Sequence, residues 1–464
     1  MEISGNRTLL SFINNDEKSS QKSPQLEIYE PDPQNSRPAK YYTASLTDPY
    51  SPPSPESPWA CTPTNPSPPS TLLYQCIASL HRHDGNIFSI AVLHGSVFTG
   101  SESSHIRVWK QMDFAERGYL KTNSGDVRAI LAYGNMLFTT HKDHKVRVWS
   151  VTNNSGDFRS RKLTMLPPQN SFRLFSRKKT LQHQDCISCL AYYHAEGLLY
   201  TGSWDKTVKT WRVSDQRCMD SFVAHNDAIS AIVVNQEDGS VFTCSSDGSV
   251  KIWRRVYGEN SHTLTMTLKF QLSPVNALAI SSSLNSCYLY SASSDGLISF
   301  WKKEKISSRF NHGGFLQGHK YSVLCVVAME RLIFSGSEDT TVRIWRREEG
   351  SSFHECLAVL DGHRGPVRSL AACLENVVMG FLVFSASMDG TFKVWRVRIF
   401  PEEKNTSKYE RVQRDPKLKL MEYETVKRSD LDTKFMECEI RAALEILSAN
   451  VMFAHYHITI FGLV

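Results

Sequence analysis

The sequence predicts an all-β fold built from seven copies of one unit, and three recurring positions carry that prediction. Seven tryptophans close the same short phrase; a hydroxyl-bearing residue stands ten positions before each, and an aspartate stands six before all but the first. The tryptophans are Trp109, Trp149, Trp211, Trp253, Trp301, Trp345 and Trp395; the hydroxyl residues are Thr99, Thr139, Thr201, Thr243, Ser291, Ser335 and Ser385; the aspartates are Asp143, Asp205, Asp247, Asp295, Asp339 and Asp389, with Ser103 in the first copy. Such a register indicates one supersecondary unit repeated around an axis or along a line.

Each copy has the pattern of short strands joined by a tight turn. In the sixth copy, small and apolar residues precede the turn at Asp339, and Val342 to Trp345 alternates with period two, as a half-buried strand does. An earlier strand is opened in five copies by a histidine four residues before an aliphatic residue: His83, His183, His225, His319 and His363. Asn123 and Gln271 stand there in copies two and five. The segment after each tryptophan can supply a fourth strand.

These positions resemble the WD40 repeat family over about residues 72–400. The resemblance implies a seven-bladed β-propeller with four strands in each blade. The aspartate that follows the tryptophan in the family's name is absent, because the seven tryptophans precede Lys110, Ser150, Arg212, Arg254, Lys302, Arg346 and Arg396. The other repeat positions are kept. The resemblance also implies a hydrogen-bond network in which the aspartate orients the histidine, the histidine meets the hydroxyl, and the hydroxyl meets the indole N–H.

Closure of the ring follows from a count of strands. Residues 72–80 form one strand without a blade, and the chain after Trp395 changes in composition at Pro401. We expect residues 72–80 to supply the outer strand of the seventh blade, because this pairing removes exposed edges. The expected organisation is a disordered leader (1–71), a propeller (72–400) and a short C-terminal tail (401–464).

The recurring Ser or Thr, His and Asp also look like a hydrolase triad. A nucleophile needs one site, whereas the complete set occurs in four copies, so we interpret it as structural. Cys186 and Cys189 form a CxxC pair without a second pair or a set of metal-spaced histidines, so we expect no metal site. We expect no catalytic residues and no cofactor.

Composition indicates the compartment and excludes some partners. The 53 basic and 47 acidic residues leave a charge of +6 spread along the chain, which does not predict a nucleic-acid surface. Eleven cysteines without paired spacing predict reduced thiols rather than a disulfide framework. We see no signal peptide and no apolar stretch long enough to cross a membrane. We expect a monomer in the cytoplasm, the nucleus or both.

The leader contains 13 of the 19 prolines and is too polar to form a core. Its Ser-Pro and Thr-Pro pairs are candidate sites for proline-directed kinases: Ser51, Ser54, Ser57, Thr62 and Ser67. The alternative is a solvated leader that is not modified.

Two further segments depart from the repeat. A basic insertion at about 152–177 precedes residues 178–182, which we expect to form the outer strand of blade two. The insertion would then leave between the third and fourth strands, and the resemblance implies that this loop lies on the face opposite the histidines. It can bind an acidic partner, serve as a nuclear signal, or be merely solvated. In the tail, residues 430–447 predict an amphipathic helix capped by Ser429, followed by an apolar end at 451–464.

Partners of propellers commonly use the face formed by the histidine loops and the aspartate turns. Trp204 precedes a turn aspartate and has no role in the repeat, and tryptophan is favoured at interface hot spots. The alternative for Trp204 is packing on its neighbouring loop. The candidate partner-binding residues are Trp204, Tyr321, Arg364, Glu338, Lys142 and Met388, with Arg128 and Arg368 flanking loops on the same face.

The leading prediction is therefore a non-enzymatic scaffold that binds proteins or peptides. The Ser/Pro-rich leader, the basic insertion and the Trp-Arg or Trp-Lys endings resemble the plant JINGUBANG-type branch of WD40 proteins, which implies an intracellular regulator of development or signalling. The alternative is a substrate receptor of a cullin-type ubiquitin ligase. Such receptors carry an Asp after a blade tryptophan and an Arg three after it, and here Arg398 follows Trp395 at that distance but Arg396 replaces the Asp. A third class, an enzyme with a small-molecule site in the central channel, has the least support.

Overall fold

The computed structural model describes residues 72–81, 85–93, 95–154, 157–168, 181–256, 258–269, 272–283, 286–375 and 380–400. The predictions for the leader, for its phosphorylation sites, for His83 and Gln271, and for the tail with its helix lie outside these residues.

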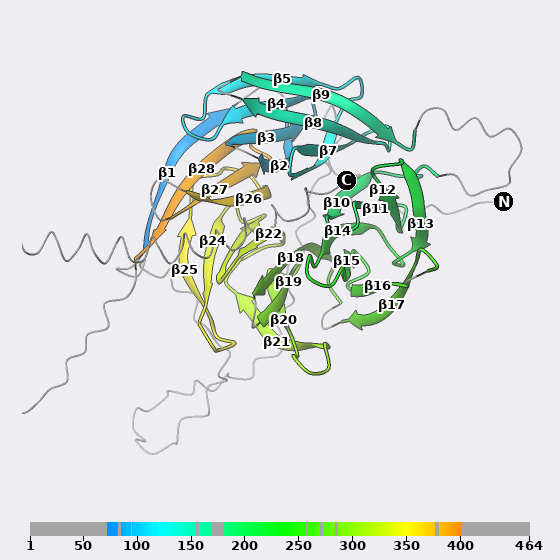
Figure 1. Ribbon diagram of the computed structural model, residues 1–464. Helices are drawn as coiled ribbons and strands as arrows, with labels where there is room; N and C mark the ends of the chain where they lie inside the picture. Colours follow the sequence, from blue (N-terminus) through cyan, green and yellow to red (C-terminus); the bar gives the residue numbers. More distant parts are fainter. Residues whose placement is uncertain are drawn as a thin grey trace, which may run out of the picture.

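The described residues form seven four-stranded antiparallel sheets arranged as a ring, so the predicted seven-bladed all-β propeller is confirmed (Figure 1). Blade one is β2 (Ile87–Leu93), β3 (Ser96–Ser101), β4 (His105–Lys110) and β5 (Glu116–Lys121). Blade two is β6 (Val127–Tyr133), β7 (Met136–His141), β8 (Val146–Asn154) and β9 (Asp157–Leu166). Blade three is β10 (Ile187–Tyr193), β11 (Leu198–Ser203), β12 (Thr207–Arg212) and β13 (Arg217–Val223). Blades four and five are β14 (Ile229–Val234), β15 (Val241–Ser245), β16 (Val250–Val256), β17 (Ser261–Leu268); and β18 (Val275–Ser283), β19 (Ser286–Ser293), β20 (Leu297–Lys303), β21 (Phe310–Gln317). Blade six is β22 (Val323–Met329), β23 (Leu332–Ser337), β24 (Val342–Arg347) and β25 (His354–Leu360).

Blade seven combines the two ends of the ring. Its strands β26 (Val367–Glu375), β27 (Gly380–Ser387) and β28 (Thr391–Ile399) are completed by β1 (Leu72–His81), which pairs with β28 along its whole length. The innermost strands of blades seven and one, β26 and β2, also contact each other. The ring is thus closed by hydrogen bonds between residues more than 300 positions apart.

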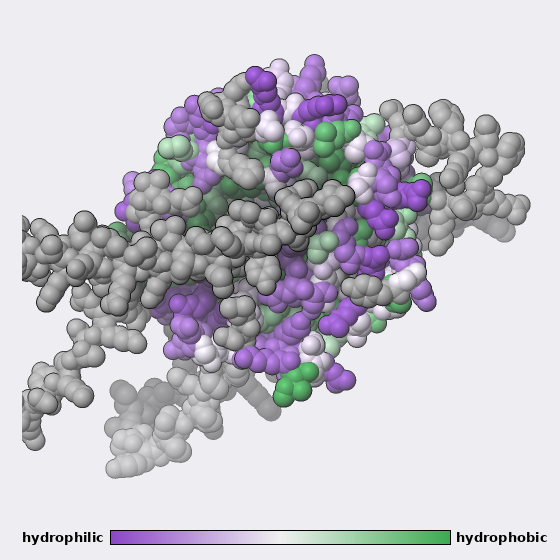
Figure 2. Space-filling view, in the orientation of Figure 1, coloured by the Kyte–Doolittle hydropathy of each residue, from purple (hydrophilic) through white to green (hydrophobic). Residues whose placement is uncertain are grey.

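The hydrophobic core lies in seven layers, each shared by two neighbouring blades. Every repeat tryptophan is buried in the layer between its own blade and the preceding one; Trp211, for example, packs with residues of blades two and three. Burying an aromatic side chain of this size contributes roughly 4–6 kcal/mol by area. The tryptophans therefore join the blades to one another. On the face shown in Figure 2, much of the coloured surface is hydrophilic.

The aspartate turns between the second and third strands share one backbone geometry. The residue after the aspartate adopts a positive φ in six blades, from 55° at His144 to 86° at Gly296. In blade three, Asp205 fixes this turn by accepting the backbone N–H of Thr207 at 2.9 Å, and its other oxygen accepts the backbone N–H of Gln184 at 2.9 Å. Each aspartate of this kind ties its turn to the histidine loop beside it.

The prediction for the outer strand of blade two is wrong. The fourth strand is β9 (Asp157–Leu166), which pairs with β8 from one end to the other, and residues 178–182 do not form it. Leu166 anchors β9 by complete burial. Arg159, Arg161 and Lys162 are exposed on this outer strand, where positive charge protects a sheet edge from pairing with another chain. Half of the presumed insertion is therefore blade, and residues 169–180 lie outside the described residues.

Candidate interaction face and channel mouth

In blades three, four, six and seven, four side chains form a continuous hydrogen-bond chain. In blade three the Trp211 indole N–H donates to Thr201 Oγ1 at 3.1 Å, Thr201 Oγ1 lies 2.8 Å from His183 Nε2, and His183 Nδ1 lies 2.9 Å from Asp205. Because the carboxylate only accepts, His183 Nδ1 carries the proton and Nε2 accepts from the hydroxyl. The same chain joins Trp253, Thr243, His225 and Asp247; Trp345, Ser335, His319 and Asp339; and Trp395, Ser385, His363 and Asp389.

This arrangement does not suit nucleophilic catalysis. The four hydroxyl residues are fully buried, at 0% exposure, so their oxygens cannot reach a substrate. Burial also lowers the pKa of His183, and the Asp205 carboxylate only partly opposes that effect. The network holds neutral imidazoles inside the blades, and its chemistry is structural.

Blade two builds the network from another position. Trp149 donates to Thr139 at 3.0 Å, and the imidazole on Thr139 is His141 Nε2, at 2.8 Å. Asp143 forms a bidentate ion pair with Arg147 instead, at 2.7 and 3.1 Å. His141 occupies the place two after the hydroxyl where the other six copies have serine. That single departure was the sequence signal for a relocated histidine, and it was missed.

Blades one and five carry shorter chains. Trp109 donates to Thr99 at 3.0 Å and Trp301 donates to Ser291 at 3.2 Å. Ser103 accepts the backbone N–H of His105 in the first turn, and Asp295 accepts that of Leu297 in the fifth.

At the histidine face, the central channel opens into a cavity of about 190 Å³, called the channel mouth below. One residue from every blade lines it, always the second residue of the innermost strand: Phe88, Arg128, Ser188, Ser230, Asn276, Leu324 and Arg368. Cys186 and Trp204 complete the wall. In the sequence, each of these seven residues directly follows the aliphatic residue that opens the innermost strand. Only the two arginines among them were singled out from the sequence.

The two arginines give the channel mouth a positive charge. Arg128 stacks over the Phe88 ring at 4.4 Å and pairs with Asp126 at 2.9 Å. Arg368 has no hydrogen-bond or ion-pair partner within the described part of the chain. Solvent reaches it through the channel, yet enclosure by the surrounding strands lowers its pKa, and the charge of Arg128 adds to this effect. Arg368 is therefore a cation without a paired anion in the described part of the chain.

Trp204 lies at the rim of this cavity, half-buried. Its backbone N–H donates to the Cys186 carbonyl at 2.9 Å, but its indole N–H has no hydrogen-bond partner among the described residues. Burial raises the pKa of Cys186 to about 11 and that of Cys189 to about 12, so both thiols stay protonated and make poor nucleophiles or metal ligands. Trp204 thus offers a free aromatic edge with one unused donor.

The other candidate partner-binding residues lie on the same side of the ring but outside the channel mouth. Tyr321 is 63% exposed and Met388 is 40% exposed, and Lys142, Glu338 and Arg364 are also exposed. They lie on the loops of blades two, six and seven, whereas Trp204 is on blade three. The structure brings Trp204 together with Arg128 and Arg368 and leaves the remaining five on the surrounding rim.

Two other classes of site are not found among the described residues. No group of three or more His, Cys, Asp or Glu side chains there is arranged to hold a metal ion. No helix in that part of the chain is long and apolar enough to cross a membrane.

A sequence model of the WD40 family, described as WD domain, G-beta repeat, matches six segments that together span half of the chain. They are residues 74–110, 175–212, 216–254, 262–302, 311–346 and 354–396. The chain belongs to the WD40 repeat family. WD40 propellers generally act as interaction scaffolds. The tryptophan phrase of blade two, the blade with the relocated histidine, lies outside the six matched segments. No curated protein matches the sequence.

Proposed function

We propose that this WD40 protein is a non-enzymatic regulatory scaffold that binds a protein or peptide on its histidine face, with the channel mouth at the centre of the contact. The observation that carries the proposal is the meeting of Trp204 with Arg128 and Arg368 at one opening. Tryptophan and arginine dominate the binding energy of protein interfaces. An unused indole donor beside an unpaired guanidinium favours a partner with an acidic residue next to an apolar one.

The rim residues supply specificity around this centre. Tyr321, Met388 and Glu338 come from blades six and seven, and Lys142 comes from blade two, so a partner lying across the opening would meet side chains of several blades. Charges at such a rim chiefly steer association and exclude wrong partners. The resemblance to JINGUBANG-type proteins supports a role in signalling in the cytoplasm or nucleus.

The alternative, a receptor for a cullin-type ligase, rests on Arg398. This residue pairs with Leu73 in the closing sheet, and its Nε atom is buried without a hydrogen-bond partner. Such a position does not favour an exposed contact with an adaptor. Stable co-purification with a cullin adaptor would nevertheless overturn this preference.

The test is quantitative affinity purification from native cells with three forms of the full chain. The first is wild type and the second carries Trp204→Ala with Arg364→Glu. The third carries Tyr119→Ala with Arg217→Glu, a matched pair on exposed outer strands. We expect partners to be lost only with the second form, while the melting temperatures of all three agree. Partners retained on a stable second form would move binding away from this face.

A further inference from the structure

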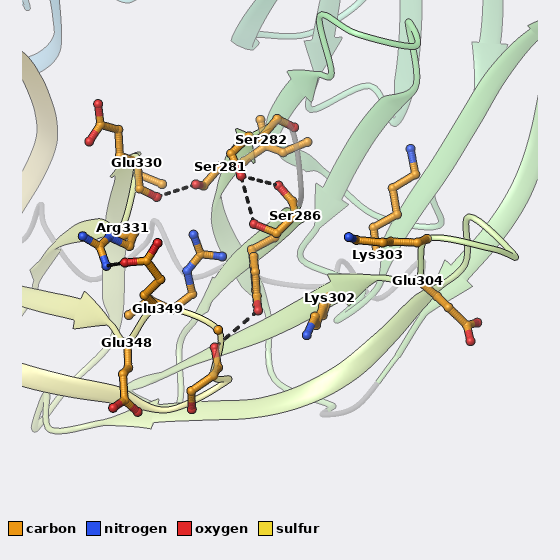
Figure 3. Close-up of a pocket in the computed structure, with 18 of the residues that line it drawn as sticks. Ser281, Ser282, Ser286, Lys302, Lys303, Glu304, Glu330, Arg331, Glu348 and Glu349 are labelled. Carbon is orange, nitrogen blue, oxygen red and sulfur yellow. Dashed lines mark hydrogen bonds and ion pairs between the residues drawn. The ribbon is translucent and has the colours of Figure 1, made fainter. Parts of the chain in front are cut away.

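A larger cavity of about 1070 Å³ lies between blades five and six, at the ends of the strands opposite the histidine face. Its walls come from β18, β19 and the β20–β21 turn of blade five, and from the β22–β23 and β24–β25 turns of blade six. Figure 3 shows Lys302 and Lys303 on one side of it and Arg331, Glu348 and Glu349 on the other. It is independent of the channel mouth and of the function proposed above.

The repeat itself explains why this cavity is unusual. In blades four, five and six, the residue two after the tryptophan is a cation: Arg255, Lys303 and Arg347. Each of these side chains points toward the preceding blade. Arg255 forms an ion pair with Glu196 of blade three, and Lys303 pairs with Asp238 of blade four at 2.7 Å.

The acidic partners also share one register. Glu196 and Asp238 both stand five residues before the hydroxyl of their repeat, at Thr201 and Thr243. The matching position in blade five, five residues before Ser291, is Ser286. The third cation of the series, Arg347, therefore faces a serine where the other two face a carboxylate.

Arg347 shows the consequence of this missing acid. It is only 6% exposed and lies over the Tyr288 ring at 3.8 Å, yet its guanidinium has no hydrogen-bond or ion-pair partner among the described residues. The Lys302 ammonium lies over the same ring at 5.8 Å and is also without an anion. Both side chains line the cavity. A buried guanidinium without an anion is unfavourable, and a second cation nearby adds to the cost.

We propose that this cavity binds a phosphate monoester, whose dianion takes the place of the carboxylate found at the two neighbouring blade junctions. Arg347 would bind the phosphate oxygens with its planar donors, and Lys302 would supply the second positive charge. The hydroxyl of Ser283 also lines the cavity and can donate to the ester.

The remaining charges at the cavity limit what else the ligand can carry. Arg331 is paired with Glu349 at 2.9 Å, and Lys303 is paired with Asp238, so neither is free for a second anion. Lys305 also lines the cavity, but it is exposed to solvent, where its attraction for a second anion is weak. Glu304, Glu330 and Glu348 are exposed at the rim and repel negative charge. The site therefore selects one phosphate on a neutral or polar body, either a small molecule or a phosphorylated serine, and disfavours polyanions.

The decisive variants restore or mimic the missing acid on the full chain. Ser286→Glu supplies the carboxylate of the neighbouring junctions, and Ser286→Gln supplies the same shape without charge. Arg347→Gln removes the cation, and Arg255→Gln is the matched change at a junction that already has its acid. Binding of glycerol 3-phosphate is measured by titration calorimetry at constant ionic strength, with glycerol as the neutral probe.

We expect saturable binding of glycerol 3-phosphate to wild type, Ser286→Gln and Arg255→Gln, and affinities at least about tenfold weaker for Ser286→Glu and Arg347→Gln. Ser286→Glu should also raise the melting temperature, which separates loss of binding from loss of folding. A short phosphoserine peptide in place of glycerol 3-phosphate distinguishes a protein-borne phosphate from a small molecule by its relative affinity. Absence of saturable phosphate binding to wild type, or equal affinity of Ser286→Glu and Ser286→Gln, would overturn the proposal.

Discussion

Blades two and three are neighbours with the same four strands, yet they satisfy the same buried groups in different ways. In blade three the imidazole on the central hydroxyl comes from the loop before the first strand and is oriented by Asp205. In blade two the imidazole comes from His141 within the second strand, and Asp143 pairs with Arg147 instead of a histidine. The Nδ1 atom of His141 has no hydrogen-bond partner. The hydroxyl and the tryptophan are the same in both.

The difference shows which parts of the network the fold requires. A buried Trp N–H and a buried hydroxyl both need partners, and any imidazole within reach can supply one. The position of the histidine is therefore free to change, whereas the Trp–hydroxyl pair is present in all seven blades. The family model leaves the tryptophan phrase of blade two unmatched.

The largest effect is expected from deleting residues 72–81. If blades two and three were independent units, both would survive the loss of β1. Because the outer strand of blade seven closes the ring, we expect cooperative unfolding of the whole propeller to disappear, as followed by circular dichroism during heating. A melting temperature equal to that of the full chain would show that the blades stand alone.

Acid should destabilise the propeller through the buried imidazoles of several blades, including blades two and three. Burial lowers the pKa of His141 to about 3 and that of His354 to about 4, and it lowers the pKa of His183 and His225 as well. These imidazoles are neutral in the folded state. Their contribution to the free energy of unfolding is therefore complete above pH 6.5, the pKa of an imidazole in the unfolded chain, and is lost as the pH falls below that value. Protonation of His354 alone can lower the free energy of unfolding by at most ~3 kcal/mol.

Chemical denaturation at several pH values measures this dependence. The free energy of unfolding should be nearly constant just above pH 6.5 and should fall steadily between that value and about 4. A curve that is flat over the acidic range would mean that the imidazoles are charged or exposed in the folded protein.

The smallest effect concerns the histidine of blade two alone. His141→Ser restores the serine of the other copies but leaves Thr139 without its imidazole, and we expect a loss of about 1–3 kcal/mol in urea denaturation. Adding Asn123→His returns a histidine to the usual loop position and should recover part of that loss. Asn123→His by itself should be nearly neutral, since Thr139 is already paired. A double variant no better than His141→Ser would mean that the loop of blade two cannot seat a histidine.

Much of the fold could be predicted because its signals recur. Positions kept in register revealed the seven repeats and the extra strand before the first histidine. The resemblance to the WD40 family then implied the seven-bladed ring. The outer strand of blade two was misplaced because residues 152–177 were interpreted as an insertion. Phe158 and Leu166, near the two ends of the true strand, pack into the layers on either side of blade two.

The candidate sites were harder to predict because they depend on contacts between blades. Nothing in one repeat shows that seven inner-strand residues converge on a single opening. The unpaired state of Arg347 emerges only when its own position is compared with Ser286 of the preceding blade. The aligned repeats already place the seven inner-strand residues at one position and Arg347 and Ser286 at two others. Inferring contacts from these positions requires the arrangement of the blades, in which the third strand of one blade faces the second strand of the blade before it.

The pairing of β1 with β28 has a further consequence for the topology of the chain. Leu72 and Ile399 are direct partners, so the ring begins and ends at one point, at the strand ends away from the histidine loops (Figure 1). The propeller is nearly a circular polymer with a single nick. A circular permutant with Leu72 joined to Ile399 by a short linker could be opened between any two blades, and a tether attached at either natural end of the ring would leave the channel mouth accessible.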